Sequence, residues 1–140
     1  LKILGDPEIL PKNLRDLIDE TADISTHYEG FQANVCLNYG GRDEIVRAAL
    51  RFAEDYKAGK VSTLTEESFS AYMFSAGIPD PDLIIRPGGE MRLSNFLMWE
   101  SAYSELIFTD VLWPDFTSED IDAAIAEYQR RDRRFGGIKK

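Results

Sequence analysis

The sequence predicts an α/β fold in which a parallel β-sheet is flanked by helices. Short apolar segments typical of strands alternate along the chain with segments whose apolar residues recur at helical spacing. The apolar run at 83–85 contains no polar residue, which is typical of a strand covered on both faces. No repeat, low-complexity segment or linker interrupts this alternation, so the 140 residues are expected to form one compact unit.

The first half of the chain contains two predicted strands and two long predicted helices. They are a strand over residues 1–5, a helix that starts at Pro11, a strand over residues 31–37 and a helix that ends at Gly59. Proline is favoured at the first position of a helix, which places the start of the first one. Asp43 and Glu44 lie in the first turn of the second helix, where negative charge is favourable.

The second half contains two further predicted strands and three helices. They are a short helix before Gly77, a strand over residues 83–85, a helix from Asn95, a strand over residues 106–108 and a helix after Thr117. Thr63 and Glu66 have the spacing of a capping box, as do Thr117 and Asp120. The helix from Asn95 is predicted because Phe96, Trp99 and Tyr103 follow at helical spacing.

Composition narrows the functional classes. The chain has 25 acidic and 16 basic residues, a formal charge of −9, which argues against non-specific nucleic-acid binding. Its single cysteine, Cys36, cannot form an internal disulfide, so a reducing, cytoplasmic environment is expected. The chain starts with Leu1 directly in a predicted strand and is expected to be the C-terminal portion of a longer protein.

Basic residues are concentrated at the C-terminus. Six of the 16 lie in the last eleven residues: Arg130, Arg131, Arg133, Arg134, Lys139 and Lys140. Positive charge there complements the dipole at the end of the final predicted helix. On charge alone, a solvated helix end explains the cluster as well as a binding role does.

The strongest candidate site is the loop after the predicted strand 83–85. Arg86 follows that strand at the edge of the sheet where parallel sheets bind ligands. Gly88 and Gly89 leave room for a ligand, Arg92 follows them, and Ser94 stands where the next helix is predicted to begin. Two guanidinium groups, a hydroxyl and a helix N-terminus suit a diphosphate. The alternative is that Arg86 pairs with a carboxylate and Ser94 only caps the helix.

Two other loops are weaker candidates. The glycines of the turn at residues 38–42 could cradle a phosphate, with Arg42 bracing the site, but glycines there more often only permit a turn with positive φ. Glu105 precedes the strand 106–108, and a lone carboxylate there is usually a surface residue. It becomes a Mg²⁺ candidate only beside a diphosphate, because Mg²⁺ commonly bridges one or two carboxylates and phosphate oxygens. The loop with Arg86 and Arg92 has neither a P-loop spacing nor a G-x-G-x-x-G motif, so a nucleotide is not specifically indicated.

These residues carry a resemblance to a known family. The stretch over residues 84–116, from Ile-Ile-Arg-Pro to Trp-Pro-Asp-Phe, resembles the C-terminal signature of the cis-prenyltransferases, most of all the bacterial undecaprenyl diphosphate synthases. The turn at residues 38–42 and the terminal residues 131–137 also resemble that family. The similarity covers essentially the whole chain, and a signature of this length is very specific.

The resemblance implies prenyl transfer: isopentenyl diphosphate condenses with an allylic diphosphate, such as farnesyl diphosphate, to a longer cis-polyprenyl diphosphate, here undecaprenyl diphosphate for the cell-wall lipid carrier. It assigns isopentenyl diphosphate binding to Arg86, Arg92, Leu93 and Ser94, and a share of a Mg²⁺ site to Glu105. Arg134 and Gly136 would reach across a homodimer to phosphate. The product would partition into the membrane, with the enzyme cytoplasmic or peripheral to it. Alternate residues of the strand 31–37 would help to line an apolar tunnel, although core packing explains these residues equally well.

The chain departs from the family pattern in two ways. The N-terminal Met-Asp-Gly-Asn-Gly-Arg-Trp motif is absent, so no catalytic residue is assigned. Residues 1–140 are therefore expected to be the C-terminal part of a single catalytic domain, inactive alone. Pro87 also stands where threonine or serine is common. Two other interpretations stay open: a non-catalytic partner subunit of the same fold, against which the retained Arg86, Arg92 and Ser94 argue, and a generic phosphate-binding α/β module.

Overall fold

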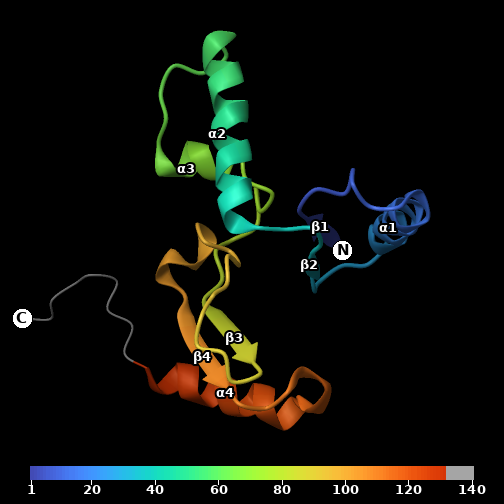
Figure 1. Ribbon diagram of the computed structural model, residues 1–140, viewed down its shortest axis with the longest axis vertical. Coiled ribbons are helices and arrows are strands. Elements are labelled where there is room, and N and C mark those ends of the chain that lie inside the picture. The colour runs from blue at the N-terminus through green and yellow to red at the C-terminus, as the bar shows by residue number, and fades with distance from the viewer. Residues whose placement is uncertain (132–140) are drawn as a thin grey trace, which may run out of the picture. The chain divides into compact units, whose positions relative to one another are not determined.

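The structure is a computed structural model, and it describes residues 1–131 (Figure 1). Contacts divide the chain into two compact units, the first comprising Leu1–Ile78 and the second starting at Pro79, so the prediction of one compact unit is wrong. Each unit contains a pair of parallel strands with helices beside it, which confirms the predicted α/β class. That both units belong to one catalytic domain stays a prediction. Among the described helices, none has the length and apolar character that spanning a membrane requires.

The first unit is built on the parallel pair β1–β2, in which Leu4 lies opposite Cys36. Its elements are β1 (Lys2–Leu4), α1 (Lys12–Ser25), β2 (Asn34–Cys36), α2 (Gly41–Lys57) and α3 (Glu66–Ser70). The strand predicted over residues 31–37 is thus limited to three residues, and Phe31 is 94% exposed. A strand of three residues does not support an apolar tunnel wall along the whole of residues 31–37.

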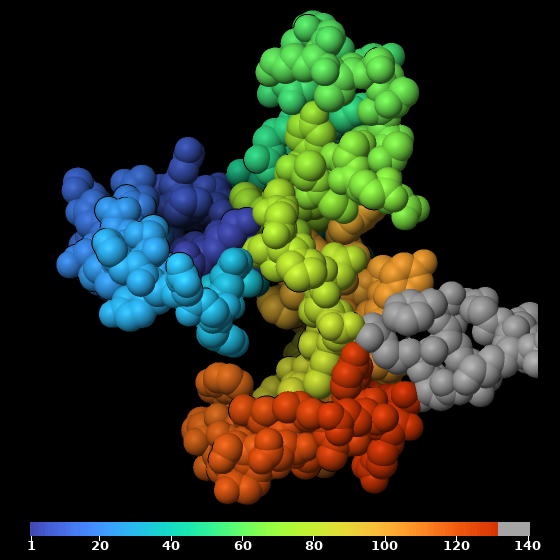
Figure 2. All heavy atoms as spheres, turned by 180° about the vertical axis from the view of Figure 1, so that it is seen from behind, coloured from blue at the N-terminus to red at the C-terminus, as the bar shows by residue number. Residues whose placement is uncertain are grey.

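Helix α1 follows Pro11, as predicted, but it buries none of its residues. Leu17 and Ile24 on this helix are more than half exposed. In the space-filling view, α1 is part of the blue region of the surface (Figure 2). Leu14, Ile18 and Ala22 are half-buried, so the tertiary burial of α1 within the described residues is partial.

A glycine is required where β1 ends. Gly5 has φ of +123°, and a Cβ built on it would lie 2.1 Å from the carbonyl oxygen of Leu37. The two segments stay close beyond this point, because the Asn38 side-chain amide donates to the Asp6 carbonyl oxygen at 3.0 Å. The chain after β1 is thereby held against the chain after β2.

We expect Gly5→Ala to lower the free energy of unfolding by about 2–4 kcal/mol, because it adds a clash with backbone to a strained φ. Gly30→Ala is the matched control: Gly30 also has a positive φ, +103°, but nothing lies within 4 Å of its Cβ position. This control should cost only about 1 kcal/mol. Urea unfolding of the two variants measures the difference, and equal losses would contradict the close approach at Gly5.

One carboxylate lies at the centre of the first unit. Glu44 in α2 is fully buried, and it accepts hydrogen bonds from the Tyr39 hydroxyl and from the backbone N–H groups of Phe74 and Ser75, at 2.7 and 3.4 Å for the latter two. A buried carboxylate is tolerated when such donors surround it. Glu44 therefore joins α2 to the segment after α3.

The second unit is built on the parallel pair β3 (Leu83–Pro87) and β4 (Glu105–Thr109). Leu83 lies opposite Glu105, and Arg86 lies opposite Phe108. Both strands are half-buried in this structure, so the prediction that residues 83–85 are covered on both faces is not confirmed. The short 3₁₀ helices η1 (Glu100–Tyr103) and η2 (Trp113–Asp115) flank β4.

Helix α4 (Ser118–Arg130) packs against β4. The predicted capping box at its start is confirmed: Asp120 accepts from the Thr117 N–H at 2.8 Å and from its hydroxyl at 2.9 Å. The corresponding prediction for α3 is two residues early, because its box is formed by Thr65 with Ser68 and not by Thr63.

Candidate functional site

Arg86 lies near the carboxyl end of β3, as predicted. Its Nη1 donates to the backbone carbonyl oxygen of Arg92, so the side chain closes the loop between the two residues. Among the described residues, no carboxylate pairs with Arg86. The described residues therefore do not support the alternative of a carboxylate partner, and a guanidinium has donors beyond the one used here.

The two glycines of this loop also have a structural role. Gly88 and Gly89 have φ of +97° and +75°. Their N–H groups donate to the carbonyl oxygens of Val111 and Thr109, at 2.8 and 2.9 Å. These donors are engaged with the end of β4 and the chain after it, so the two glycines hold the loop in place. Nothing lies within 4 Å of a Cβ placed on Gly88, and the room that the glycines leave for a ligand stays a prediction.

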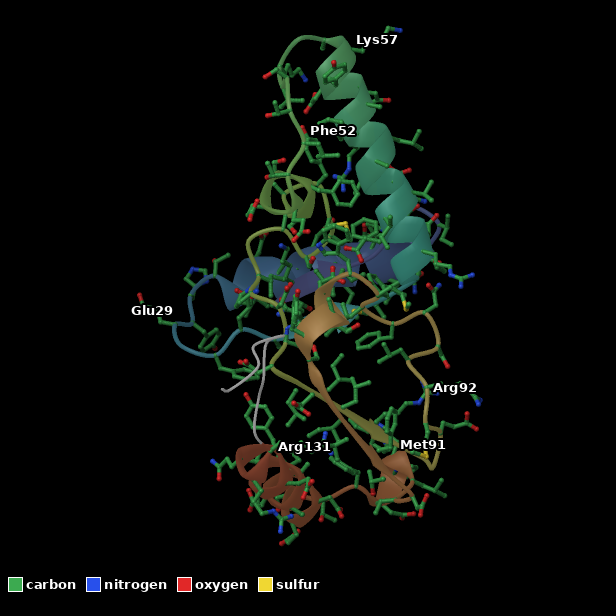
Figure 3. All side chains as sticks on the ribbon, turned by 90° about the vertical axis from the view of Figure 1, so that its left-hand side faces the viewer. Glu29, Phe52, Lys57, Met91, Arg92 and Arg131 are labelled. Atoms are coloured by element: carbon green, nitrogen blue, oxygen red, sulfur yellow. The ribbon has the colours of Figure 1, made fainter. Side chains whose placement is uncertain are left out.

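Arg92 carries its own acidic partner. Its guanidinium pairs with Glu90, and its side chain is 65% exposed. Figure 3 labels Arg92 beside Met91 on this loop. Sequence reasoning missed Glu90, although an acid between two arginines in one loop was a signal for it. An anionic ligand at Arg92 would have to replace or share this carboxylate, which makes Arg92 the weaker of the two arginine contacts.

The helix predicted from Asn95 is wrong. Ser94, Asn95 and Leu97 all have positive φ, between 45° and 67°, and such backbone cannot continue a right-handed helix. The first helical turn is instead η1 at Glu100. Ser94 is exposed in this turn, and Leu93 closes it by accepting from the Phe96 N–H at 3.0 Å. Ser94 thus offers a hydroxyl without the helix N-terminus that was expected beside it.

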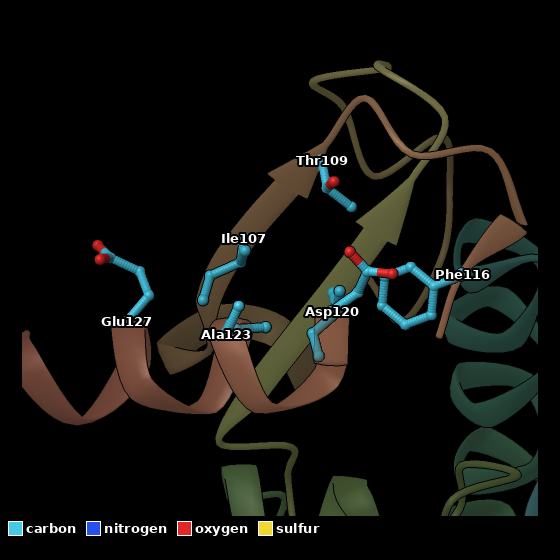
Figure 4. Close-up of a pocket in the computed structure, with 8 residues that line it drawn as sticks. Ile107, Thr109, Phe116, Asp120, Ala123 and Glu127 are labelled. Atoms are coloured by element: carbon cyan, nitrogen blue, oxygen red, sulfur yellow. The ribbon is translucent and has the colours of Figure 1, made fainter. Parts of the chain in front are cut away.

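Glu105 lies away from Arg86. It is the first residue of β4, at the amino end of the strand pair, whereas Arg86 is near the carboxyl end. Side chains alternate between the faces of a strand, so Glu105 shares a face with Ile107 and Arg86 takes the opposite one. Ile107 faces α4, since it lines a pocket of about 170 Å³ with α4 residues (Figure 4).

Arg131 holds the Glu105 carboxylate. Arg131 Nη1 donates to Glu105 Oε2 at 2.9 Å and to the Leu106 carbonyl oxygen at 3.0 Å, and its Nε donates to Glu127 Oε1 at 3.3 Å. These contacts, with Glu105 first, raise the pKa of the Arg131 guanidinium. The pKa of Glu127 is lowered by Arg131 and then by Arg130. Arg131, one residue of the basic C-terminal cluster, thus has a structural role: its contacts join the end of α4 to β4.

The described residues do not fit a Mg²⁺ site beside Arg86. No group of three His, Cys, Asp or Glu residues within 1–131 is arranged to hold a metal ion. Glu105, the predicted ligand, is on the other face of the strand pair from Arg86 and is paired with Arg131. A metal at the Arg86 loop would need its ligands from a substrate and from residues outside this part of the chain.

The remaining predicted residues are placed as follows. Arg42 lies in the first turn of α2, in the other unit, so its bracing role stays a prediction. In the turn before α2 the positive φ belongs to Asn38 and to neither glycine, which corrects the structural interpretation of that loop. Arg134 and Gly136 lie outside the described residues.

A family model described as undecaprenyl diphosphate synthase matches residues 1–136. The chain belongs to this family. An isoprenyl transferase of Clostridium perfringens is 48% identical over 141 residues, which are 99% of this chain and 56% of that protein. A Thermoplasma volcanium protein, named as a tritrans,polycis-undecaprenyl-diphosphate synthase specific for geranylgeranyl diphosphate, is 46% identical over 97% of this chain and 54% of its own. The chain thus spans about half the length of these relatives.

Solved structures of family members share the fold. Lavandulyl diphosphate synthase from Lavandula x intermedia, in complex with dimethylallyl diphosphate, has a TM-score of 0.94 and 36% identity. A probable undecaprenyl diphosphate synthase from Campylobacter jejuni has a TM-score of 0.84 and 33% identity. This chain is covered to 97% in each case, and those chains to 59% and 62%, which confirms the prediction of an incomplete fold.

Proposed function

We propose that the full-length protein carrying this chain is a prenyltransferase. It condenses isopentenyl diphosphate with an allylic diphosphate, such as farnesyl diphosphate, into a longer cis-polyprenyl diphosphate, undecaprenyl diphosphate. Membership of the undecaprenyl diphosphate synthase family supports the reaction class. The observation that carries the site is Arg86, a guanidinium at the end of β3 that no described carboxylate neutralises.

The second diphosphate contact in this proposal comes from the same loop. Arg86 donates to the Arg92 backbone, and Ser94 stands two residues further on with its hydroxyl exposed. A diphosphate bound by these groups would gain charge-assisted hydrogen bonds, which are about twice as strong as neutral ones. Leu93 contributes through the turn that its carbonyl oxygen closes.

Three further parts of the proposal concern the whole protein. It is a homodimer, in which Arg134 and Gly136 contact phosphate across the interface. It requires Mg²⁺, and its product enters the membrane while the protein stays cytoplasmic or peripheral. The 140-residue chain alone is inactive, because it spans about half the length of its relatives.

The test is prenyl transfer by the full-length protein and by the 140-residue chain. Each is incubated with farnesyl diphosphate and labelled isopentenyl diphosphate, with Mg²⁺ and with EDTA. We expect longer labelled product only from the full-length protein with Mg²⁺. Product from the chain alone would overturn its inactivity. A full-length protein that binds any phosphate ester equally, and forms no product, would instead be a phosphate-binding module.

A further inference from the structure

The chain makes a tight turn where β4 ends. Thr109 is the last residue of β4, and its side-chain Oγ1 accepts a hydrogen bond from the partly buried N–H group of Val111 at 3.2 Å. A threonine hydroxyl that binds the backbone two residues further on closes a local turn without help from another segment. The Thr109 hydroxyl therefore fixes the direction in which the chain leaves the strand.

This turn supplies the backbone acceptors of the glycine pair after β3. The Thr109 carbonyl oxygen accepts from the Gly89 N–H at 2.9 Å, and the Val111 carbonyl oxygen accepts from the Gly88 N–H at 2.8 Å. The two segments approach closely, because a Cβ built on Gly89 would lie 3.2 Å from Asp110 Oδ1. One hydroxyl thus holds two carbonyl groups in the positions that the loop contacts.

The side chain of Thr109 lies on the opposite face of the strand pair from Arg86. Arg86 pairs with Phe108 in the strand register, and neighbouring residues of a strand face opposite sides of the sheet. Thr109 lines the pocket that the strand pair forms with α4, and its side chain is drawn there at the end of β4 (Figure 4). A diphosphate on the Arg86 face would not touch this hydroxyl, so Thr109 can act on such a ligand only through the backbone.

We propose that Thr109 is a positioning residue for the loop that carries Arg86 and Arg92. Its hydroxyl fixes the turn at residues 109–111, and the turn fixes the glycine pair of the loop. This inference rests on the proposed function, in which Arg86 and Arg92 bind the diphosphate of isopentenyl diphosphate. The bond between these two arginines closes the loop on itself, whereas the glycine bonds attach it to the end of β4. A small displacement of binding groups weakens binding strongly, so loss of the turn weakens the diphosphate contacts.

The test compares Thr109→Val, Thr109→Ser and Thr117→Val in the full-length protein. Valine keeps the branched shape of threonine but cannot accept the Val111 N–H, whereas serine can. We expect Thr109→Val to raise KM for isopentenyl diphosphate about fivefold, because one hydrogen bond that positions the loop is lost. KM for the allylic diphosphate should change by less than about twofold, since the loop is assigned to the other substrate. Thr109→Ser should stay within about twofold of the wild type for both substrates.

Thr117 provides the matched control in the same unit. Its hydroxyl bonds to Asp120 in the capping box of α4, so Thr117→Val should lower the unfolding temperature. KM for isopentenyl diphosphate should nevertheless stay within about twofold. An equal rise in this KM in Thr117→Val and Thr109→Val overturns the proposal, because lost stability would then explain both. Thr109→Ala also lacks the hydroxyl, and it takes the place of Thr109→Val if the valine variant does not fold.

A second measurement reports on the loop without any reaction. Amide hydrogen exchange over residues 86–92 of the full-length protein, followed by mass spectrometry, should be about tenfold faster in Thr109→Val than in the wild type. It should be unchanged in Thr109→Ser and in Thr117→Val. Unchanged exchange in Thr109→Val overturns the link between the turn and the loop.

The outcomes separate this role of Thr109 from the proposed function. Faster exchange with both KM values unchanged overturns the positioning role, as does an equal rise in both KM values. If the wild-type full-length protein transfers no prenyl group, the proposed function fails, and the role of Thr109 in binding isopentenyl diphosphate fails with it. The exchange result still decides whether the Thr109 hydroxyl holds the loop.

Discussion

Arg86→Ala should lower kcat/KM for isopentenyl diphosphate by about two decades in the full-length protein. A charge-assisted hydrogen bond contributes about 1.5–3 kcal/mol, and Arg86 also closes its own loop through the Arg92 carbonyl oxygen. Arg92→Ala should cost about one decade, because Glu90 already neutralises part of its charge. Steady-state kinetics with isopentenyl diphosphate varied at saturating allylic substrate measure both losses.

The matched control for Arg86 is Arg51. It is also an arginine that donates to a backbone carbonyl oxygen, in this case that of Tyr72, but it lies in the first unit. Arg51→Ala should change kcat/KM by less than about twofold if the effect at Arg86 comes from the diphosphate site. A loss at Arg51 as large as that at Arg86 would indicate a general effect on the fold. Arg86→Lys should restore part of the rate, since an ammonium keeps the charge but not the fork.

Glu44→Ala should lower the free energy of unfolding of this chain by about 3 kcal/mol. The substitution removes the acceptor that the Tyr39 hydroxyl and the Phe74 N–H share, both of them partly buried, and a buried polar group that loses an acceptor costs about 1–3 kcal/mol. Glu44→Gln should cost less, because its amide oxygen still accepts from Phe74. Urea or thermal unfolding measures the change.

Glu54 provides the control on the same helix. It is exposed in α2, so Glu54→Ala should change stability by no more than about 0.5 kcal/mol. A similar loss in both variants would mean that the helix, rather than the buried carboxylate, determines the result.

The strands of the second unit could be predicted because their apolar runs are short and bounded by polar or turn residues. The start of α4 could be predicted because the Thr117 box is a local feature of four residues. The apolar spacing of Phe96, Trp99 and Tyr103 was misleading for the opposite reason. It fits a helix equally well when the backbone is a series of turns, and positive φ at Ser94, Asn95 and Leu97 cannot be read from composition.

The candidate site was predictable in its residues and less so in its partners. Arg86 follows an apolar strand, and that order alone places it at the ligand-binding edge of a parallel sheet. The separation of Glu105 from Arg86 depends on the β3–β4 register, which no local sequence signal sets. The contact between Arg131 and Glu105 could not be predicted either, because it joins residues that are 26 positions apart in the sequence.

The loop that carries Arg86 and Arg92 is fastened at both ends. Arg86 donates to the Arg92 carbonyl oxygen, and the N–H groups of Gly88 and Gly89 donate to Val111, after β4, and to Thr109, the last residue of β4. The shape of the Arg86 loop therefore depends on the pairing of β3 with β4, and a change that separates the two strands should also release the loop.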